Sequence, residues 1–205
     1  MRKKAPGSYH HGDLRRSLIE AGRMLLAKNG TGGLSLREVA KVAGVSHTAP
    51  YRHFKDKAEL LAAIAEAGFV QLRADTAHTA RDHREAPLEQ YTRCAAGYVR
   101  FAVENPETAH LMFGGGIDMR TAPASLKQAS WATFELLIEI IENGKAAGLY
   151  KEVDTMDLAV TTWSGIHGLS LLIANGYLSR LASTDAQVDD LSLRVGKLML
   201  EGIRV

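Results

Sequence analysis

The chain has 205 residues, of which 46% are hydrophobic and 23% are charged, the proportions of a folded globular protein rather than a disordered one. That length suffices for one large domain or two small ones around a buried core. Its single cysteine, Cys94, excludes a disulfide bond within the chain and fits a reducing cytoplasm.

The net charge of +2 conceals an uneven distribution along the chain. Residues 1–57 contain 12 basic and 4 acidic side chains, whereas residues 58–205 contain 13 basic and 19 acidic ones. A basic end joined to an acidic remainder indicates a nucleic-acid footprint on that end only. A solvated basic face without a partner is the alternative.

The first twelve residues are basic and polar, and we expect a mobile arm over residues 1–12. Its Arg2, Lys3 and Lys4 could reach phosphates or the minor groove of DNA, as basic arms do. A tail without a function is the alternative. No apolar run follows, so we expect no secretion signal. Asp13 can then cap a first helix.

Residues 35–54 read SLREVAKVAGVSHTAPYRHF and contain two short helical patterns joined by a tight turn. Ser35 can cap the first helix, with Glu38 at the position of a capping box. Gly44 can adopt the positive φ that ends this helix, and Ser46 can cap a second helix that runs to the end of the segment. The pattern predicts a helix-turn-helix motif, whose second helix can lie in the major groove of DNA.

The second predicted helix carries small and hydrogen-bonding side chains. His47, Thr48 and Ala49 come first, where a recognition helix meets base edges, and residues 51–53 can donate hydrogen bonds to phosphates. Pro50 removes one backbone hydrogen bond, a small loss near a first turn. An ordinary pair of core helices is the alternative explanation of these residues.

A longer helix is predicted to follow and to connect the two ends of the chain. Asp56 can cap it, with Glu59 at the capping-box position, and we expect it to run to about Ala80. Its apolar face consists of Leu60, Leu61, Ile64, Gly68 and Leu72.

The run from Ser35 to Leu60 resembles the DNA-binding domain of the tetracycline-repressor (TetR) family of bacterial regulators. The matching residues are Leu36-Arg37-Glu38-Val39-Ala40, Gly44-Val45-Ser46, Tyr51-Arg52-His53-Phe54, Lys57 and Leu60. Pro50 departs from the family pattern, which usually has an aliphatic residue there. The resemblance implies base contacts by Arg37, His47, Thr48 and Ala49 and phosphate contacts by Tyr51, His53 and Lys57. Ser46 and Arg52 complete the predicted DNA-binding set.

The rest of the chain reads as helices without strand-like alternation. Pro87 suits the start of one helix, and Asn105-Pro106 ends it and starts a short one. Three further helices are expected over about 123–147, 154–175 and 185–203. The prediction is an all-α protein of about nine helices, with a three-helix bundle at 13–57 and a second helical domain at 58–205.

The last two helices show two kinds of apolar pattern. Residues 158–174 are apolar nearly all round, which predicts a helix covered on several sides; they are too short and too polar for a membrane span, so no membrane partner is expected. The final helix repeats apolar or small residues at intervals of three and four, which indicates a seam for another helix. That seam consists of Val188, Leu191, Val195, Leu198 and Gly202.

Residues 162–169 resemble the Trp-His-Gly motif of one subgroup of TetR-family ligand-binding domains. The resemblance implies a helical regulatory domain that binds a small molecule and dimerises through its last two helices. Trp163 and His167 share one helix face, so they can be pocket residues, or His167 can be a hydrogen-bonded core histidine. Further pocket candidates, each also explicable as core, are Tyr98, Phe101, His110, Met112, Phe113, Trp131 and Phe134.

An enzyme is a rival interpretation with little support in the residues. Ser164 and His167 are three apart, but no nucleophile elbow surrounds the serine. His78 and Asp82 share a helix face, but two ligands fall short of a usual metal site. We therefore expect no cofactor, no metal and no catalytic residue.

The expected function is that of a homodimeric transcriptional regulator, most simply a repressor. It would bind palindromic double-stranded DNA and release it when a small molecule occupies the C-terminal domain. A dimeric DNA-binding protein without a ligand is the first alternative, which a solid C-terminal core would favour.

Overall fold

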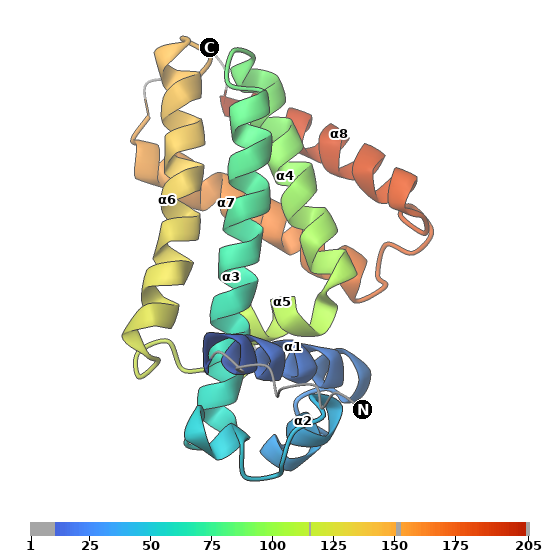
Figure 1. Cartoon of the computed structure of the whole chain (residues 1–205). Coiled ribbons are helices and arrows are strands. Elements are labelled where there is room, and N and C mark those ends of the chain that lie inside the picture. The colour runs from blue at the N-terminus through green and yellow to red at the C-terminus, as the bar shows by residue number, and fades with distance from the viewer. Residues whose placement is uncertain (1–10, 115, 151–152, 204–205) are drawn as a thin grey trace, which may run out of the picture.

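The computed structural model of the protein describes residues 11–114, 116–150 and 153–203 and is all-helical there, as predicted (Figure 1). The predicted basic arm lies outside the described residues except for its last two positions. The helices of the described part are α1 (His11–Asn29), α2 (Leu36–Val42), the 3-10 helix η1 (Pro50–Arg52), α3 (Lys57–Asp82), α4 (Pro87–Glu104), α5 (Pro106–Phe113), α6 (Ala124–Ala146), α7 (Thr155–Ala174) and α8 (Asp185–Ile203).

Three helix starts have a side-chain cap. The Ser35 hydroxyl accepts a hydrogen bond from the Glu38 amide at 3.2 Å, and the Asp56 carboxylate accepts one from the Glu59 amide at 2.9 Å. Asp154 caps α7 in the same way. These bonds satisfy amide groups that have no partner within the helix. The prediction for α1 was wrong, because α1 begins at His11 and so contains the predicted cap residue, two positions further on.

α3 runs almost the full height of the molecule and joins its two parts (Figure 1). Near its start, Leu60 and Ile64 are fully buried in a cluster with Leu18 of α1. Near its end, Ala80 belongs to a second cluster formed with α4, α6, α7 and α8. A change at either end of α3 can therefore reach the other through one continuous helix.

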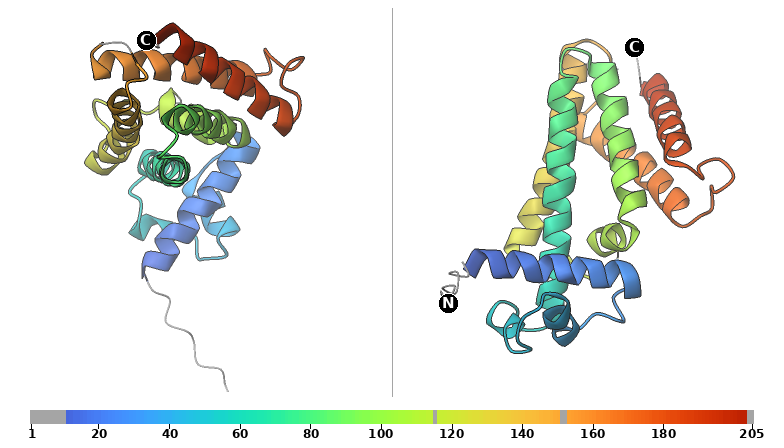
Figure 2. Two further views of the ribbon diagram at one scale, coloured as in Figure 1. Left: turned by 90° about the horizontal axis from the view of Figure 1, so that it is seen from above. Right: turned by 45° about the vertical axis from the view of Figure 1, so that its right-hand side comes forward.

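The second part is a bundle in which α3, α4, α6 and α7 pack against one another and α8 packs on the outer side of α4 (Figure 2). The pocket candidate Trp131 is not a core residue, because 52% of its surface is exposed. The seam predicted on α8 is only partly covered within one chain, since Val188 is buried and Leu198 is 64% exposed. None of the helices in the described residues has the length and apolar character required to cross a membrane.

Candidate functional site: a helix-turn-helix and an aromatic cavity

The second helix of the predicted motif is much shorter than expected. Instead of a helix over residues 46–54, the structure has a turn followed by the single 3-10 turn η1. Pro50 opens η1 and lacks the N–H that would donate to Ser46. The Ala49 amide donates to the Ser46 carbonyl at 3.0 Å, and the Ser46 hydroxyl pairs with that of Thr48 at 3.2 Å, so Ser46 does not cap a helix through its side chain.

The segment from Ser46 to Lys57 nevertheless presents its polar side chains to solvent. We call it the reading segment. Two buried residues, Pro50 and Phe54, attach it to the bundle, and the Arg15 guanidinium lies 5.5 Å above the Phe54 ring. Of the predicted DNA-binding set, Ala49, His53 and Lys57 are half-buried and the exposed members are Arg37, Ser46, His47, Thr48, Tyr51 and Arg52.

Lys57 has an additional role within the chain. Its ammonium group donates a hydrogen bond of 2.6 Å to the Thr31 carbonyl, which ties the start of α3 to the turn after α1. An ammonium has three donors, so two remain for other partners. Gly44 ends α2 with a φ of 68°, as the turn requires.

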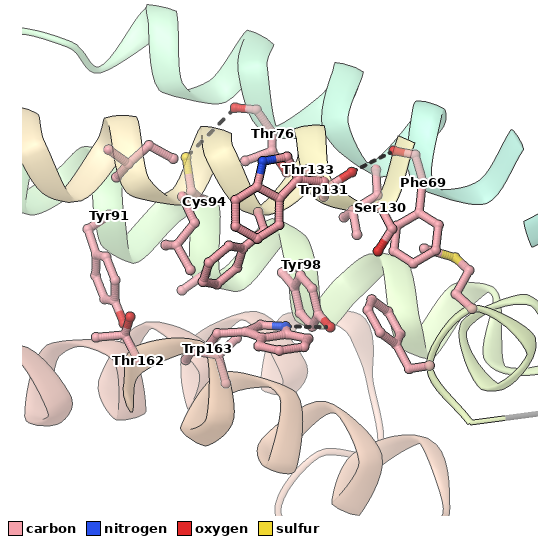
Figure 3. Close-up of a pocket in the computed structure, with 18 of the residues that line it drawn as sticks. Phe69, Thr76, Tyr91, Cys94, Tyr98, Ser130, Trp131, Thr133, Thr162 and Trp163 are labelled. Carbon is pink, nitrogen blue, oxygen red and sulfur yellow. Dashed lines mark hydrogen bonds between the residues drawn. The ribbon is translucent and has the colours of Figure 1, made fainter. Parts of the chain in front are cut away.

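A cavity of about 560 Å³ lies between α3, α4, α6 and α7 (Figure 3). Its walls are mainly apolar, and seven of the chain's thirteen aromatic residues line it. On α6 the lining extends from Lys127 to Ile140, which at 1.5 Å per residue is about 20 Å. A concave, mostly apolar site with a few polar groups is the usual form of a small-molecule site.

Most of the predicted pocket residues meet in this cavity. The predicted residues that line it are Tyr98, Met112, Phe113, Trp131, Phe134 and Trp163. Two predictions were wrong: Phe101 faces the N-terminal cluster, and His110 lies on the exposed side of α5. Lining residues that the sequence did not single out include Phe69, Thr76, Tyr91, Cys94, Lys127, Ser130 and Thr162. They alternate with core residues on the same helices, so spacing alone could not separate them.

His167 lies behind the wall of the cavity. Its Nδ1 is 2.9 Å from the Tyr98 hydroxyl, which also accepts a hydrogen bond of 3.3 Å from the Trp163 indole. Burial lowers the pKa of His167, so the imidazole is neutral near pH 7 and can accept the Tyr98 proton. His167 is therefore a hydrogen-bonded histidine that positions the lining residue Tyr98. This role combines the two interpretations of the sequence, a pocket residue and a core histidine.

Tyr91 closes the end of the cavity opposite Lys127. Its hydroxyl is buried and has no hydrogen-bond partner among the described residues. Burial raises the pKa of Tyr91, an effect that the nearby Thr162 side chain opposes without meeting hydrogen-bond geometry. Cys94 lies beside it, and burial raises the pKa of its thiol to about 12, so it is not a reactive thiolate.

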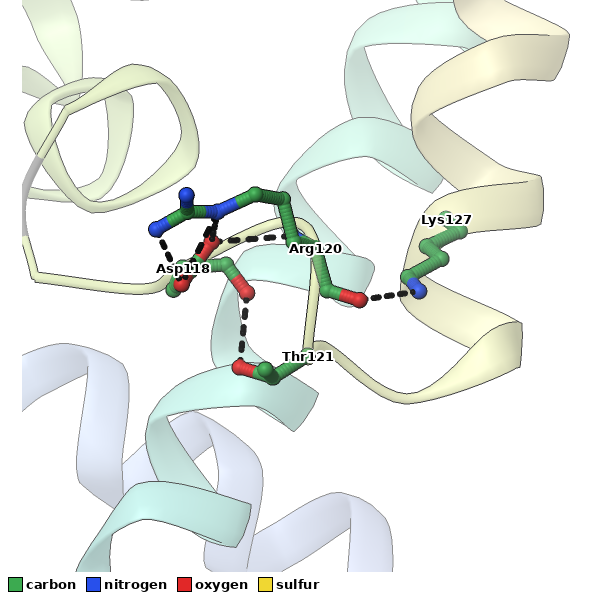
Figure 4. A network of polar contacts seen from close by, with 4 residues as sticks. All are labelled: Asp118, Arg120, Thr121 and Lys127. Atoms are coloured by element: carbon green, nitrogen blue, oxygen red, sulfur yellow. Dashed lines mark hydrogen bonds and ion pairs between the residues drawn. The ribbon is translucent and has the colours of Figure 1, made fainter.

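The loop between α5 and α6 contributes to the other end of the cavity. Figure 4 shows the polar contacts of this loop. Asp118 holds the Arg120 guanidinium at 2.8 Å, and this pairing lowers the pKa of Asp118. The Lys127 ammonium donates a hydrogen bond of 2.8 Å to the Arg120 carbonyl. Met119, in the middle of this loop, lines the cavity.

The pair considered as metal ligands forms a simple surface contact. His78 and Asp82 are 3.1 Å apart and both are exposed. Within the described ranges, no three side chains of His, Cys, Asp or Glu gather closely enough to hold a metal.

Two protein-family models match the chain. The model described as "Bacterial regulatory proteins, tetR family" covers residues 18–64, and "Tetracyclin repressor-like, C-terminal domain" covers residues 91–194, half of the chain. The chain belongs to the TetR family. The first match contains α2, the reading segment and the start of α3; the second contains most of the cavity. The Trp-His-Gly subgroup remains a prediction.

Curated transcriptional regulators are similar to this chain over about half of its length. The HTH-type transcriptional regulator Rv1816 of Mycobacterium tuberculosis is 32% identical over 108 residues, which is 52% of this chain and 46% of that protein. The matched region thus spans about half the length of this curated relative. The regulator Mb1846 of Mycobacterium bovis matches to the same extent.

Solved structures share the TetR-family fold over nearly the whole chain. A protein with unknown function from Rhodococcus sp. RHA1 has a TM-score of 0.84 and 32% identity, and the match covers 98% of this chain and 100% of that one. The transcriptional regulator FadR from Bacillus subtilis, solved with stearoyl-CoA, has a TM-score of 0.68 at 18% identity, over 92% and 98% of the two chains. At that identity the likeness concerns the fold alone.

Proposed function

We propose that this chain is a homodimeric DNA-binding transcriptional regulator, most simply a repressor, whose affinity for DNA is controlled by a small molecule in the aromatic cavity. The observation that carries the proposal is the course of α3. Leu60 and Ile64 hold its start in the helix-turn-helix cluster, while Phe69, Leu72 and Thr76 line the cavity. A ligand that moves this wall also moves the reading segment.

The DNA-binding part rests on the exposed groups of the reading segment. His47 and Thr48 offer hydrogen-bonding groups for base edges, and Arg52 offers a charge for a phosphate. We assign the domains the roles expected from the sequence, with DNA binding at 13–57 and ligand binding and dimerisation at 58–205. The arm at 1–12 would add contacts to the DNA backbone.

Dimerisation would use the last two helices, as expected from the sequence. α7 was predicted to be covered on several sides, but within one chain its Val160 and Leu172 are 47% and 46% exposed. Leu198 of α8 is likewise uncovered. Apolar surface of this kind is typical of a protein interface, and a second copy would cover it. Two reading segments about 34 Å apart would then match successive major grooves.

The cavity favours this proposal over a dimer without a ligand, because the C-terminal core is not solid. The neighbouring structure of FadR with stearoyl-CoA is an example of this fold with a small molecule bound, which supports an effector but does not identify it. The family match favours a regulator over an enzyme.

The proposal can be tested by selecting binding sites for the purified protein from random duplex DNA. We expect a near-palindrome with half-sites one helical turn apart. Arg52→Gln should weaken binding to all sequences and reduce the slope of log affinity against log salt by about 1. His47→Ala should instead relax the preference at one position of each half-site.

Lys145→Gln is the matched control, because it removes a positive charge from α6, far from the reading segment. It should leave both the salt slope and the sequence preference unchanged. Selection of no common sequence, or a monomer in solution at the concentrations used, would refute the proposed function.

A further inference from the structure

The charge of the cavity lining is confined to one end. Among the described residues that line the cavity, Lys127 is the only one with a charged side chain, and none is Asp or Glu. Because Lys127 is exposed and Trp131, one turn further along α6, is 52% exposed, this end opens to solvent. Burying a charge in the apolar interior would be costly, whereas a charge at this opening stays partly hydrated.

Two polar side chains of α6, Lys127 and Ser130, lie at the opening, three residues apart and therefore on one helix face. Trp131 shares this face, but its indole N–H already donates to the Glu135 carboxylate at 2.6 Å. The Ser130 hydroxyl lies at the cavity wall (Figure 3), and the Lys127 ammonium keeps two donors beyond its bond to the Arg120 carbonyl (Figure 4). Together they can hold an anion at the cavity opening.

The walls beyond this point are suited to flat rings. The Trp131 and Phe134 rings are 5.6 Å apart, and Phe134 and Trp163 are 5.8 Å apart. Phe113 continues the series at 6.1 Å from Trp163. Aromatic ligands gain from offset or edge-to-face contacts with such walls, and a rigid ring system loses less conformational freedom than a flexible chain.

We infer that the effector is an elongated aromatic carboxylic acid, whose rings fill the cavity and whose carboxylate is bound by Lys127 and Ser130. This inference rests on the proposed role of the cavity, and it specifies the class of molecule. A cationic ligand would meet the repulsion of Lys127, and the Glu135 carboxylate beside the opening is already engaged by the Trp131 indole.

The test compares two molecules of almost the same shape by calorimetric titration of the full chain without DNA. The probes are para-phenylbenzoic acid, which is negatively charged at pH 7, and para-phenylbenzamide, which is neutral. We expect the acid to bind roughly tenfold more tightly at low salt, and the ratio to shrink as salt screens the exposed ammonium. In Lys127→Gln the acid should lose this advantage while the amide keeps its affinity.

Lys145→Gln is again a matched control. Lys145 is on the same helix, and its ammonium also donates to a backbone carbonyl, that of Val153 at 2.9 Å, but it does not line the cavity. This variant should retain the preference for the acid. Equal affinity of acid and amide, a preference that survives Lys127→Gln, or binding of neither probe would each overturn the inference. Since no DNA is present, those results would leave the DNA-binding proposal to its own test.

Discussion

The two hydrophobic clusters of this protein are built differently. The cluster beneath the reading segment is solid: Leu18, Leu26, Leu60 and Ile64 have no exposed surface. The cluster of the C-terminal bundle borders a cavity, which Phe69, Leu72 and Met112 of the first cluster also line, and it contains two buried tyrosine hydroxyls without a partner among the described residues. The difference is one of packing: the part beneath the reading segment is filled, whereas the C-terminal bundle leaves a volume that the proposed ligand would occupy.

Truncation of one phenylalanine in each cluster should give the largest contrast. Phe54 is 1% exposed and anchors the reading segment, so Phe54→Ala should lower the free energy of unfolding by about 3–5 kcal/mol. Phe134 is half-buried and already faces the cavity, so Phe134→Ala forfeits contacts on fewer sides and should cost less than half as much. Denaturant unfolding measures both. Equal losses would mean that the cavity is closed up in solution.

The same two variants should also differ in DNA binding. Since Pro50 and Phe54 are the buried residues that attach the reading segment, Phe54→Ala should also abolish selective DNA binding under conditions where the protein remains folded. Phe134→Ala should retain DNA binding and change only the response to a ligand.

Two tyrosines of the cavity wall offer a smaller and sharper contrast. The Tyr98 hydroxyl has two hydrogen-bond partners, so Tyr98→Phe should destabilise the protein by roughly 1 kcal/mol and leave His167 unpartnered. Tyr91→Phe removes a hydroxyl that makes no bond and should be neutral or slightly stabilising. Thermal unfolding in the absence of ligand measures both, and a loss in Tyr91→Phe would show that its hydroxyl is bonded after all.

Local signals made much of this architecture predictable. Ser35, Asp56 and Asp154 cap helices because a cap needs only a side-chain oxygen two or three residues before a free amide. The TetR-family match was likewise visible in consecutive residues. The prediction of a helix over residues 46–54 was wrong. It assumed that Pro50 is tolerated in a first turn, whereas the structure has turns and the short helix η1 there.

The cavity was only partly predictable. Its aromatic residues stood out by type, but Phe101 and Phe113, twelve residues apart in the sequence, lie in the core and at the cavity wall respectively. Periodicity marks the buried face of a helix without showing whether that face meets another helix or an empty volume. The bond between Tyr98 and His167 joins residues 69 positions apart, which no local pattern encodes.

Protonation of His167 should have the smallest effect, and it is confined to the hollow part. Burial lowers the pKa of this imidazole from its ordinary 6.5, and its ring faces Tyr98, Phe113 and Trp163. Below about pH 6.5 the unfolded chain therefore binds a proton that the folded chain does not, so the free energy of unfolding falls as the pH is lowered through this range and is fully retained above it.

His167→Gln supplies the measurement for this effect, because the other titrating groups cancel when its unfolding free energy is subtracted from that of the wild type. The difference should be flat above about pH 6.5 and should decrease below it, until the folded protein also takes up the proton. Once the folded protein takes up the proton, the Tyr98 hydroxyl loses its acceptor, so tryptophan fluorescence should change at that lower pH, since both tryptophans line the cavity. A difference that does not vary with pH would mean that this imidazole is hydrated in the folded protein. The C-terminal cluster would then have no pH-dependent contribution from His167 that distinguishes it from the first cluster.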